Sequence, residues 1–294
     1  MQPCAAWEAA ASFTLIKGIS PGLLSFAHLF LRSLFHLARL PFFKYTDYSD
    51  FFMSRFDMKS DWDVRAEENA HKAIACDDAQ TEAAFRESGE RDAKLLLEGV
   101  SEILEGRQSV LEIGCGTGRL LEPLTQRFQQ VFGVDVSGEM VRRGRERLAH
   151  LSQVHFFEID GLGKLPFEGE SFDFCFSYIT FHHIPMKSVV RSYINESHRV
   201  LKMGGIARWH FFGRPAGILA SVRESVTHKD TWRGCKFTLA EIDGAVRAAG
   251  FEIVDAQYVP AKSWRLFGKT PPDIIWMTAR KSHESARSGS LGAK

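Results

Sequence analysis

The chain has 294 residues, of which 45% are apolar, and its formal net charge at pH 7 is only +1. This length and composition suffice for one open α/β domain with a sizeable core and an appendage. The small net charge excludes a global field that would recruit nucleic acid. The five cysteines have no paired spacing, which is typical of a reducing compartment, and they form no metal-ligand set. We therefore expect a cytoplasmic protein, with neither nucleic acid nor a metal as a partner.

Residues 1–58 form an apolar and basic segment, with no Asp or Glu between Ala9 and Thr46. The periodicity predicts an amphipathic helix over 23–40, which has a wide apolar face and a thin cationic stripe. Arg32 and Arg39 lie in this stripe and argue against a membrane-spanning helix. Three interpretations stay open: peripheral contact with a membrane interface, a lid on the substrate cleft or on a partner, and a cleaved targeting segment.

The rest of the chain divides into three parts by composition. Residues 59–105 are acid-rich and predict a helical lead-in, 106–281 predict an alternating α/β body, and 282–294 predict a disordered Ser/Gly tail. Inside the body, residues 214–236 predict a variable insertion over the cleft. After it, Thr238-Leu-Ala-Glu241 is a capping-box pattern that opens a helix closed by Gly250.

The pattern that carries most information is a glycine turn. The apolar run 110–113 leads into three alternate glycines, and a second apolar run ends on Asp135. This order predicts a strand, a tight nucleotide-binding turn, a helix and a second strand. Glycines have no Cβ, so a ligand can lie against the backbone amides. Asp135 falls where such a unit delivers a carboxylate to a ribose diol.

A dinucleotide cofactor is the rival interpretation of this turn. The dinucleotide pattern Gly-x-Gly-x-x-Gly needs a glycine where this chain has Arg119, and an arginine there would obstruct close packing of helix on strand. A nicotinamide-dependent oxidoreductase is therefore the less favoured alternative.

The Glu-x-Gly-x-Gly-x-Gly turn resembles that of the class I S-adenosylmethionine-dependent methyltransferases, and the resemblance continues in order over about residues 90–281. It implies a Rossmann-like, doubly wound α/β sheet of seven strands with an N-terminal helical extension. The later strands are expected at 156–161, 172–179, 206–212, 250–254 and 274–280. Residues 62–71 and 85–92 resemble the helical lead-in of a bacterial subgroup of small, mostly uncharacterised methyltransferases.

The resemblance implies S-adenosyl-L-methionine as the cofactor and assigns residues to it. Glu112 would accept from the ammonium group, directly or through a water molecule. Asp160 would meet the adenine amino group, and Met140 would lie against the adenine face or be a plain core residue. The full set implied is Glu112, Gly114, Cys115, Gly116, Asp135, Val136, Met140, Asp160, Gly161 and Ser177.

His182 and His183 are the catalytic candidates at the tip of the fourth strand. A histidine titrates near neutral pH, so either could take a proton from an attacking hydroxyl or amine. The alternative is that the pair only shapes the floor of the cleft. Arg208 and His210 alternate with Trp209 on the fifth strand, and the sequence leaves open whether they face the cleft or a surface layer.

These observations favour a methyltransferase that acts on a small-molecule or lipid-like acceptor. The apolar N-terminal helix and the aromatic residues Trp209, Phe211 and Phe212 favour an apolar acceptor. The alternative from another class is a methyltransferase-like protein that binds the cofactor or a partner without turnover. No motif encodes the acceptor atom or the oligomeric state.

Overall fold

The computed structural model describes residues 57–75, 81–214, 231–232, 234–260 and 273–282. The chain divides into two units, 1–55 and 56–294, and everything described belongs to the second unit. The helix predicted over 23–40, the tail 283–294 and most of the expected insertion lie outside the described residues. In the described part, no helix is long and apolar enough to cross a membrane.

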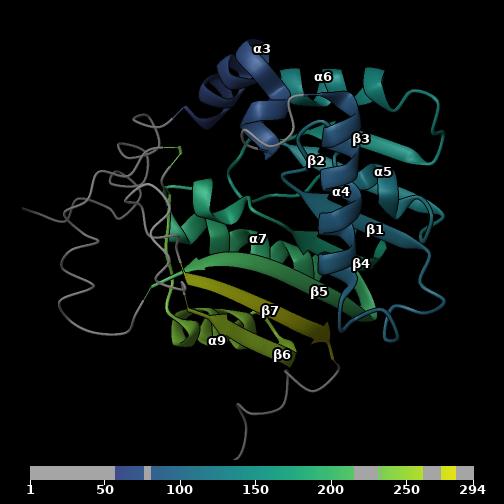
Figure 1. The fold of residues 1–294 in the computed structure, drawn as a ribbon. Helices are drawn as coiled ribbons and strands as arrows, with labels where there is room; N and C mark the ends of the chain where they lie inside the picture. Colours follow the sequence, from purple (N-terminus) through teal and green to yellow (C-terminus); the bar gives the residue numbers. More distant parts are fainter. Residues whose placement is uncertain (1–56, 76–80, 215–230, 233, 261–272, 283–294) are drawn as a thin grey trace, which may run out of the picture. The chain divides into compact units, whose positions relative to one another are not determined.

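A seven-stranded sheet forms the centre of the second unit (Figure 1). Its strand order is β3-β2-β1-β4-β5-β7-β6, in which β7 is antiparallel to both of its neighbours and the other pairings are parallel. The chain order reverses between β1 and β4, so the carboxyl ends of these strands meet at the switch point where open α/β sheets bind ligands. The strand bounds are β1 Ser109–Ile113, β2 Gln130–Asp135, β3 Val154–Glu158, β4 Phe172–Ser177, β5 Leu201–Gly213, β6 Phe251–Val259 and β7 Asp273–Lys281.

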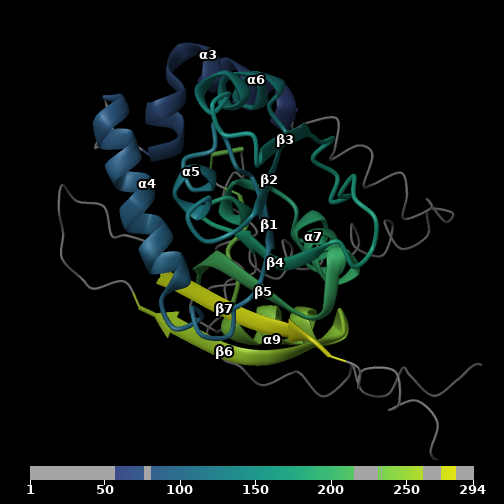
Figure 2. The ribbon, with the colours of Figure 1, turned by 90° about the vertical axis from the view of Figure 1, so that its right-hand side faces the viewer.

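Helices cover both faces of the sheet because its strands are apolar on both sides. One core contains side chains of α4, α5 and α6, and the other contains side chains of α7 and α9. Figure 2 shows α4 and α5 on the side of the sheet opposite α7. The helix bounds are α3 Met58–Ala75, α4 Glu82–Leu97, α5 Leu121–Leu124, α6 Gly138–Arg147, the 3₁₀ turn η3 Phe181–His183, α7 Lys187–Val200 and α9 Leu239–Ala248.

The predicted start of α9 is confirmed. The Thr238 side chain accepts from the Glu241 amide at 3.2 Å, and the Glu241 carboxylate accepts from the Thr238 amide at 2.8 Å. Gly250 follows the helix with φ +95°, a left-handed conformation that closes it before β6.

The helix expected after the glycine turn is much shorter than a doubly wound unit predicts. Only the four residues of α5 are helical there, and Pro123 is one of them. Proline has no amide hydrogen to give to the preceding turn and disfavours helical backbone in the residue before it. The chain therefore leaves the glycine turn through irregular turns and makes a single helical turn.

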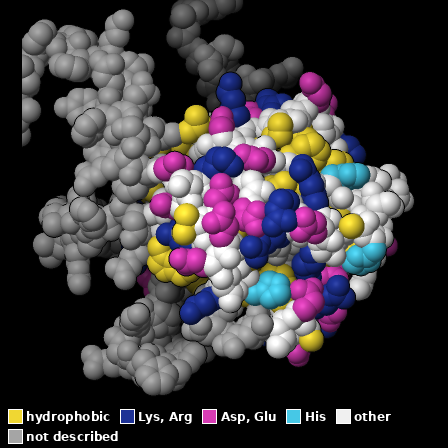
Figure 3. Space-filling view, turned by 90° about the horizontal axis from the view of Figure 1, so that it is seen from above, with side chains coloured by type: hydrophobic (Ala, Val, Ile, Leu, Met, Phe, Trp, Pro, Cys, Tyr) yellow, Lys and Arg dark blue, Asp and Glu magenta, His cyan; other side chains and the backbone are white. Residues whose placement is uncertain are grey.

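The end of the unit that carries α3 and α6 mixes charges of both signs. Figure 3 shows Lys and Arg interspersed with Asp and Glu over this surface. On α6, Arg142 and Arg143 both pair with Glu139, at 2.7 Å and 2.6 Å. Such neighbours neutralise one another, so this face has no extended patch of one sign.

Candidate active site

The glycine turn follows β1 and is held by backbone hydrogen bonds. The amides of Gly114 and Cys115 both donate to the Val134 carbonyl, at 2.8 Å and 3.0 Å. Gly114, Gly116 and Gly118 have φ values of +82°, +53° and +81°, which side chains with a Cβ rarely adopt. The predicted turn between β1 and β2 is therefore present.

The space beside these glycines is taken up by side chains of the protein itself. A Cβ on Gly114 would stand 2.1 Å from Thr180, one on Gly116 2.7 Å from Ile74, and one on Gly118 2.7 Å from Phe156. The expectation was that a ligand makes this close approach. In the structure, glycine is required because α3, β3 and the segment after β4 pack directly on the turn.

Asp135, at the end of β2, ties the two strand tips together. Its Oδ2 accepts from the Gly116 amide at 2.8 Å and its Oδ1 from the Ser137 amide at 2.9 Å. The carboxyl group is nearly buried, and this burial raises its pKa in spite of the two amides that favour the charged form. Asp135 thus shapes the turn in addition to the ribose contact predicted for it.

Glu112 is the most unusual polar group of the site. Its side chain is 3% exposed, and its Oε2 has no hydrogen-bond partner among the described residues. Burial raises its pKa to about 8, a shift that Arg119 opposes and Asp135 reinforces. The hydroxyl of Thr117, in the same turn, is also buried and has no hydrogen-bond partner in the described part of the chain. Buried polar atoms without partners are costly, so these two point to a polar ligand.

Arg119, which follows the last glycine, is accommodated by α4. A Cβ on Gly89 would stand 2.4 Å from the Arg119 carbonyl, so this helical glycine lets α4 lie on the turn. The guanidinium donates to Asp92 at 2.8 Å and to Ser88 at 3.3 Å. Sequence reasoning missed this contact. The only local sequence signal for this contact was Gly89, a glycine inside a predicted helix.

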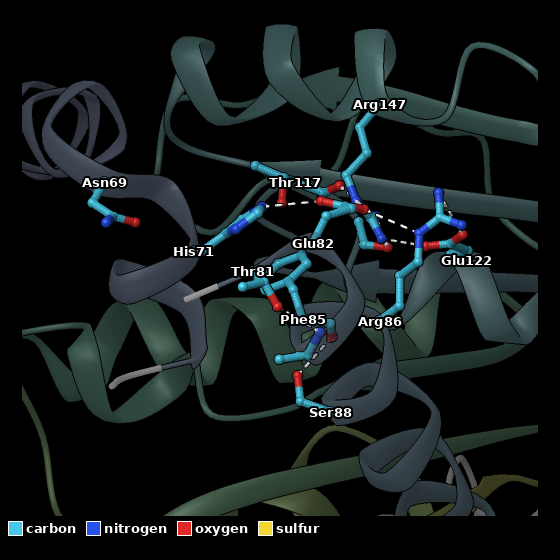
Figure 4. Close-up of polar contacts among 12 residues, drawn as sticks. Asn69, His71, Thr81, Glu82, Phe85, Arg86, Ser88, Thr117, Glu122 and Arg147 are labelled. Atoms are coloured by element: carbon cyan, nitrogen blue, oxygen red, sulfur yellow. Dashed lines mark hydrogen bonds and ion pairs between the residues drawn. The ribbon is translucent and has the colours of Figure 1, made fainter. Parts of the chain in front are cut away.

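Arg147 at the end of α6 clamps the turn from the other side (Figure 4). Its guanidinium lies 3.4 Å from the carbonyl oxygens of Thr117 and Gly118 and pairs with Glu82 at 2.8 Å. It also forms a close ion pair with Glu122. The turn is therefore held by polar contacts from α4, α5 and α6, none of which the motif itself predicts.

Helix α3 lies across the beginning of α6. Asp63 accepts from the Ser137 hydroxyl at 2.6 Å and from the Glu139 amide at 3.1 Å. Burial by itself would raise the pKa of Asp63, but these bonds together with Lys59 lower it. Met140, expected at the adenine face, is buried against Ala66 and Ala70 of α3.

The other residues assigned to the cofactor surround the same strand tips. Asp160 is exposed, and its side chain accepts from the Leu162 amide at 2.8 Å. Ser177 donates to the Ile113 carbonyl at 3.0 Å. Burial, reinforced by Asp135, raises the pKa of the Cys115 thiol, which stays neutral. A Cβ on Gly161 would stand 3.0 Å from Val136, so these two residues pack together.

The two adjacent histidines of η3 have different environments. His182 is 6% exposed and stacks on Phe212 with ring centroids 3.7 Å apart. Burial, with His183 and His210 nearby, lowers the pKa of His182 far below the ordinary value, so it is a poor base. His183 is half-buried, and its Nδ1 lies 3.0 Å from the Trp232 carbonyl. A carbonyl only accepts, so Nδ1 carries the proton and Nε2 the lone pair.

The side chains of β5 point to opposite faces, and this corrects one expectation. Trp209 and Phe211 are fully buried in the core under α7 and α9, so they do not line the site. Phe212 lies on the other face, against His182. His210 shares that face and contacts Tyr178 and Trp276, at centroid distances of 5.4 Å and 5.1 Å.

Comparison with known proteins identifies the domain. A family model described as a methyltransferase domain matches residues 110–205. The malonyl-[acyl-carrier protein] O-methyltransferase of Salmonella typhimurium is 26% identical over 59% of this chain and 61% of its own length. The 27-O-demethylrifamycin SV methyltransferase of Amycolatopsis mediterranei is 28% identical over 53% of this chain and 58% of its own length. The matches thus span about three fifths of each relative.

A solved structure shows the same fold. The S-adenosylmethionine-dependent methyltransferase structure from Methanosarcina mazei superposes with a TM-score of 0.51 at 21% sequence identity. The superposition covers 63% of this chain and 97% of the other. The sheet, the glycine turn and the switch point thus agree with the expected architecture.

Proposed function

This chain belongs to the class I S-adenosylmethionine-dependent methyltransferases, and we propose that it transfers a methyl group to an oxygen atom of a small or lipid-like acceptor. The choice of oxygen rests on the two relatives, whose names both specify methylation at oxygen. The observation that best supports the proposal is the unpartnered Oε2 of buried Glu112 beside the glycine turn, because it calls for a polar ligand group at this position.

The residues around the turn fit S-adenosylmethionine. The ionised Glu112 would pair with the ammonium group, and the second lone pairs of Asp135 would accept from the ribose hydroxyls. Thr117 supplies a hydroxyl that has no partner within the described chain. When bound, the cofactor supplies a methyl group on a sulfonium, whose bond to sulfur breaks with its electron pair left on sulfur.

The chain's own contribution is alignment, exclusion of water and proton transfer. Helix α3 covers the glycine turn through Ile74, and its Ala66 and Ala70 pack on Met140 of α6, so this helix would help to keep water from a bound cofactor. Holding the two reactants in line can contribute roughly 7 to 11 kcal/mol. His183 is placed to take the proton that the acceptor hydroxyl loses, because its Nδ1–H bond to Trp232 leaves the lone pair on Nε2.

Ligand-dependent stability of the full-length protein tests this proposal. S-adenosylhomocysteine at about 100 times its dissociation constant should raise the unfolding free energy by about 2.7 kcal/mol, and NAD should have no effect. Stabilisation by NAD alone would restore the oxidoreductase interpretation. Stabilisation by S-adenosylhomocysteine with no methyl transfer from labelled cofactor to any hydroxyl, carboxyl or amine acceptor would favour a binding protein.

A further inference from the structure

Two buried histidines lie beside the same phenylalanine at the carboxyl ends of β4 and β5. His182 comes from η3 and His210 from β5, and they are 6% and 4% exposed. The ring centroids of His182 and His210 lie 3.7 Å and 5.9 Å from that of Phe212. In each histidine, Nδ1 is buried and has no hydrogen-bond partner among the described residues.

Both rings are neutral and therefore need uncharged polar partners. Burial lowers the pKa of His210 to about 4, with Asp92 opposing the shift, and lowers that of His182 further. A neutral imidazole has one donor and one acceptor nitrogen. Leaving such an atom buried without a partner costs roughly 1 to 3 kcal/mol. Two unpartnered atoms in one cluster indicate a ligand group that can donate and accept.

The surroundings of these histidines are flat and aromatic. Tyr178 and Trp276 lie beside His210. The ring centroids of His182 and His183 are 3.9 Å apart. Asp92 is the carboxylate whose charge raises the pKa of His210. It is already paired with Arg119 at 2.8 Å. Arg208, on the same face of β5, already lies over the Trp276 ring at 4.8 Å. A planar uncharged ring would find further stacking partners among these aromatic side chains.

The cluster is also at the right place for an acceptor. Thr180, one residue before η3, donates to the Gly114 carbonyl at 3.3 Å and packs on that glycine. Phe212 is the penultimate residue of β5. The histidines therefore adjoin the glycine turn at the switch point of the sheet.

We propose that His182 and His210 hydrogen-bond the hydroxyl of an uncharged aromatic acceptor, a phenol, and so determine which acceptors are used. This inference rests on the proposed function and names the substrate class of the same site. In the bound state the hydroxyl donates to His182 and accepts from His210. In the reaction the phenolic oxygen gains the methyl carbon as the methyl group leaves sulfur, and its proton passes through His182 to His183, whose ring centroid lies 3.9 Å from that of His182. His182 and His210 select and orient the hydroxyl and stay neutral throughout.

Calorimetry on the full-length protein saturated with S-adenosylhomocysteine tests the proposal. We expect 2-naphthol to bind at least tenfold more tightly than 2-naphthoate or 2-methylnaphthalene. His182→Phe and His210→Phe should each weaken 2-naphthol binding about tenfold, because each loses one hydrogen bond but keeps a ring. Affinity for S-adenosylhomocysteine should not change. His150→Phe, at an exposed histidine, is the control and should behave as the parent.

Several results would overturn the proposal. The parent protein could bind 2-naphthoate as tightly as 2-naphthol or more tightly, or it could fail to bind 2-naphthol. Both results are measured without any variant. Another is parent-like binding of 2-naphthol by both phenylalanine variants, which would mean that water satisfies the histidines. If a phenylalanine variant does not fold, His182→Asn or His210→Asn keeps a polar atom and repeats the measurement. Failure of S-adenosylhomocysteine to bind the parent would refute the proposed function instead.

Discussion

Replacing Glu112 with glutamine should make the protein more stable at alkaline pH and weaken cofactor binding. In the folded chain the pKa of Glu112 is raised from 4.5 to about 8, so the folded state holds this proton more tightly than the unfolded state. Stability from this group is therefore fully present below pH 4.5 and is lost as the pH rises to about 8. At 1.36 kcal/mol per pH unit, the loss is roughly 4 to 5 kcal/mol.

A glutamine at position 112 does not titrate, so the unfolding free energy of Glu112→Gln lacks this dependence on pH. Urea unfolding at pH 5.5 and pH 8.0 should show the parent losing several kcal/mol more than Glu112→Gln between the two conditions. Glu252→Gln, at an exposed glutamate of β6, is the matched control and should follow the parent.

Ligand binding supplies the second half of this prediction. An ammonium group favours the ionised carboxylate, so at pH 7 the parent should release a proton when S-adenosylhomocysteine binds. Calorimetry in phosphate and in Tris, whose ionisation enthalpies differ, measures that proton. The variant should release none and bind at least tenfold more weakly, since a charge-assisted hydrogen bond contributes about 1.5 to 3 kcal/mol. Parallel pH profiles of parent and variant, with equal affinities, would refute the reasoning.

Further variants test the turn, the base and the N-terminal segment. Gly89→Ala should lower the unfolding free energy by roughly 1 to 3 kcal/mol because its Cβ meets the Arg119 carbonyl, while Gly244→Ala, in open space on α9, should raise it by about 0.5 to 1 kcal/mol. Equal urea midpoints for the two would contradict the packing of α4 on the turn. Asp135→Ala should weaken S-adenosylhomocysteine binding about a hundredfold in calorimetry, and an unchanged affinity would remove Asp135 from the site. His183→Ala should lower turnover about a hundredfold with cofactor affinity retained, and activity within a few-fold of the parent would mean a structural role. If residues 23–40 contact a membrane interface, reversing Arg32 and Arg39 to glutamate should abolish sedimentation of the full-length protein with anionic vesicles.

The glycine turn and the start of α9 could be predicted because they follow from local chemistry. Alternate glycines before Asp135 and the capping box at Thr238 each satisfy a requirement of the backbone within a few residues. Which face of β5 carries Trp209 could not be predicted, because both faces of that strand are buried and the alternation gives no sign of inside or outside.

The candidate site was predictable in its residue types but not in its contacts. The sequence indicates that Glu112 and Asp135 meet a ligand, yet Asp135 also holds the Gly116 amide. The packing of Ile74 on Gly116 and of Gly89 on Arg119 joins residues that are far apart in the sequence. Such pairs depend on where whole helices lie, and no local pattern specifies that position.

Helix α3 is interrupted at Asn69, where the backbone is extended with φ −169° and ψ 96°. Before the interruption, Trp62 meets the His183 ring edge-on at 4.9 Å, and after it, Ile74 lies on Gly116. One element therefore touches the proposed acceptor site with one half and the proposed cofactor site with the other. If each ligand orders the half of α3 that it meets, the two binding equilibria are linked. The cofactor must then improve acceptor affinity by the same factor by which the acceptor improves cofactor affinity. The break at Asn69 lies between the two halves, so any such linkage has to pass through it.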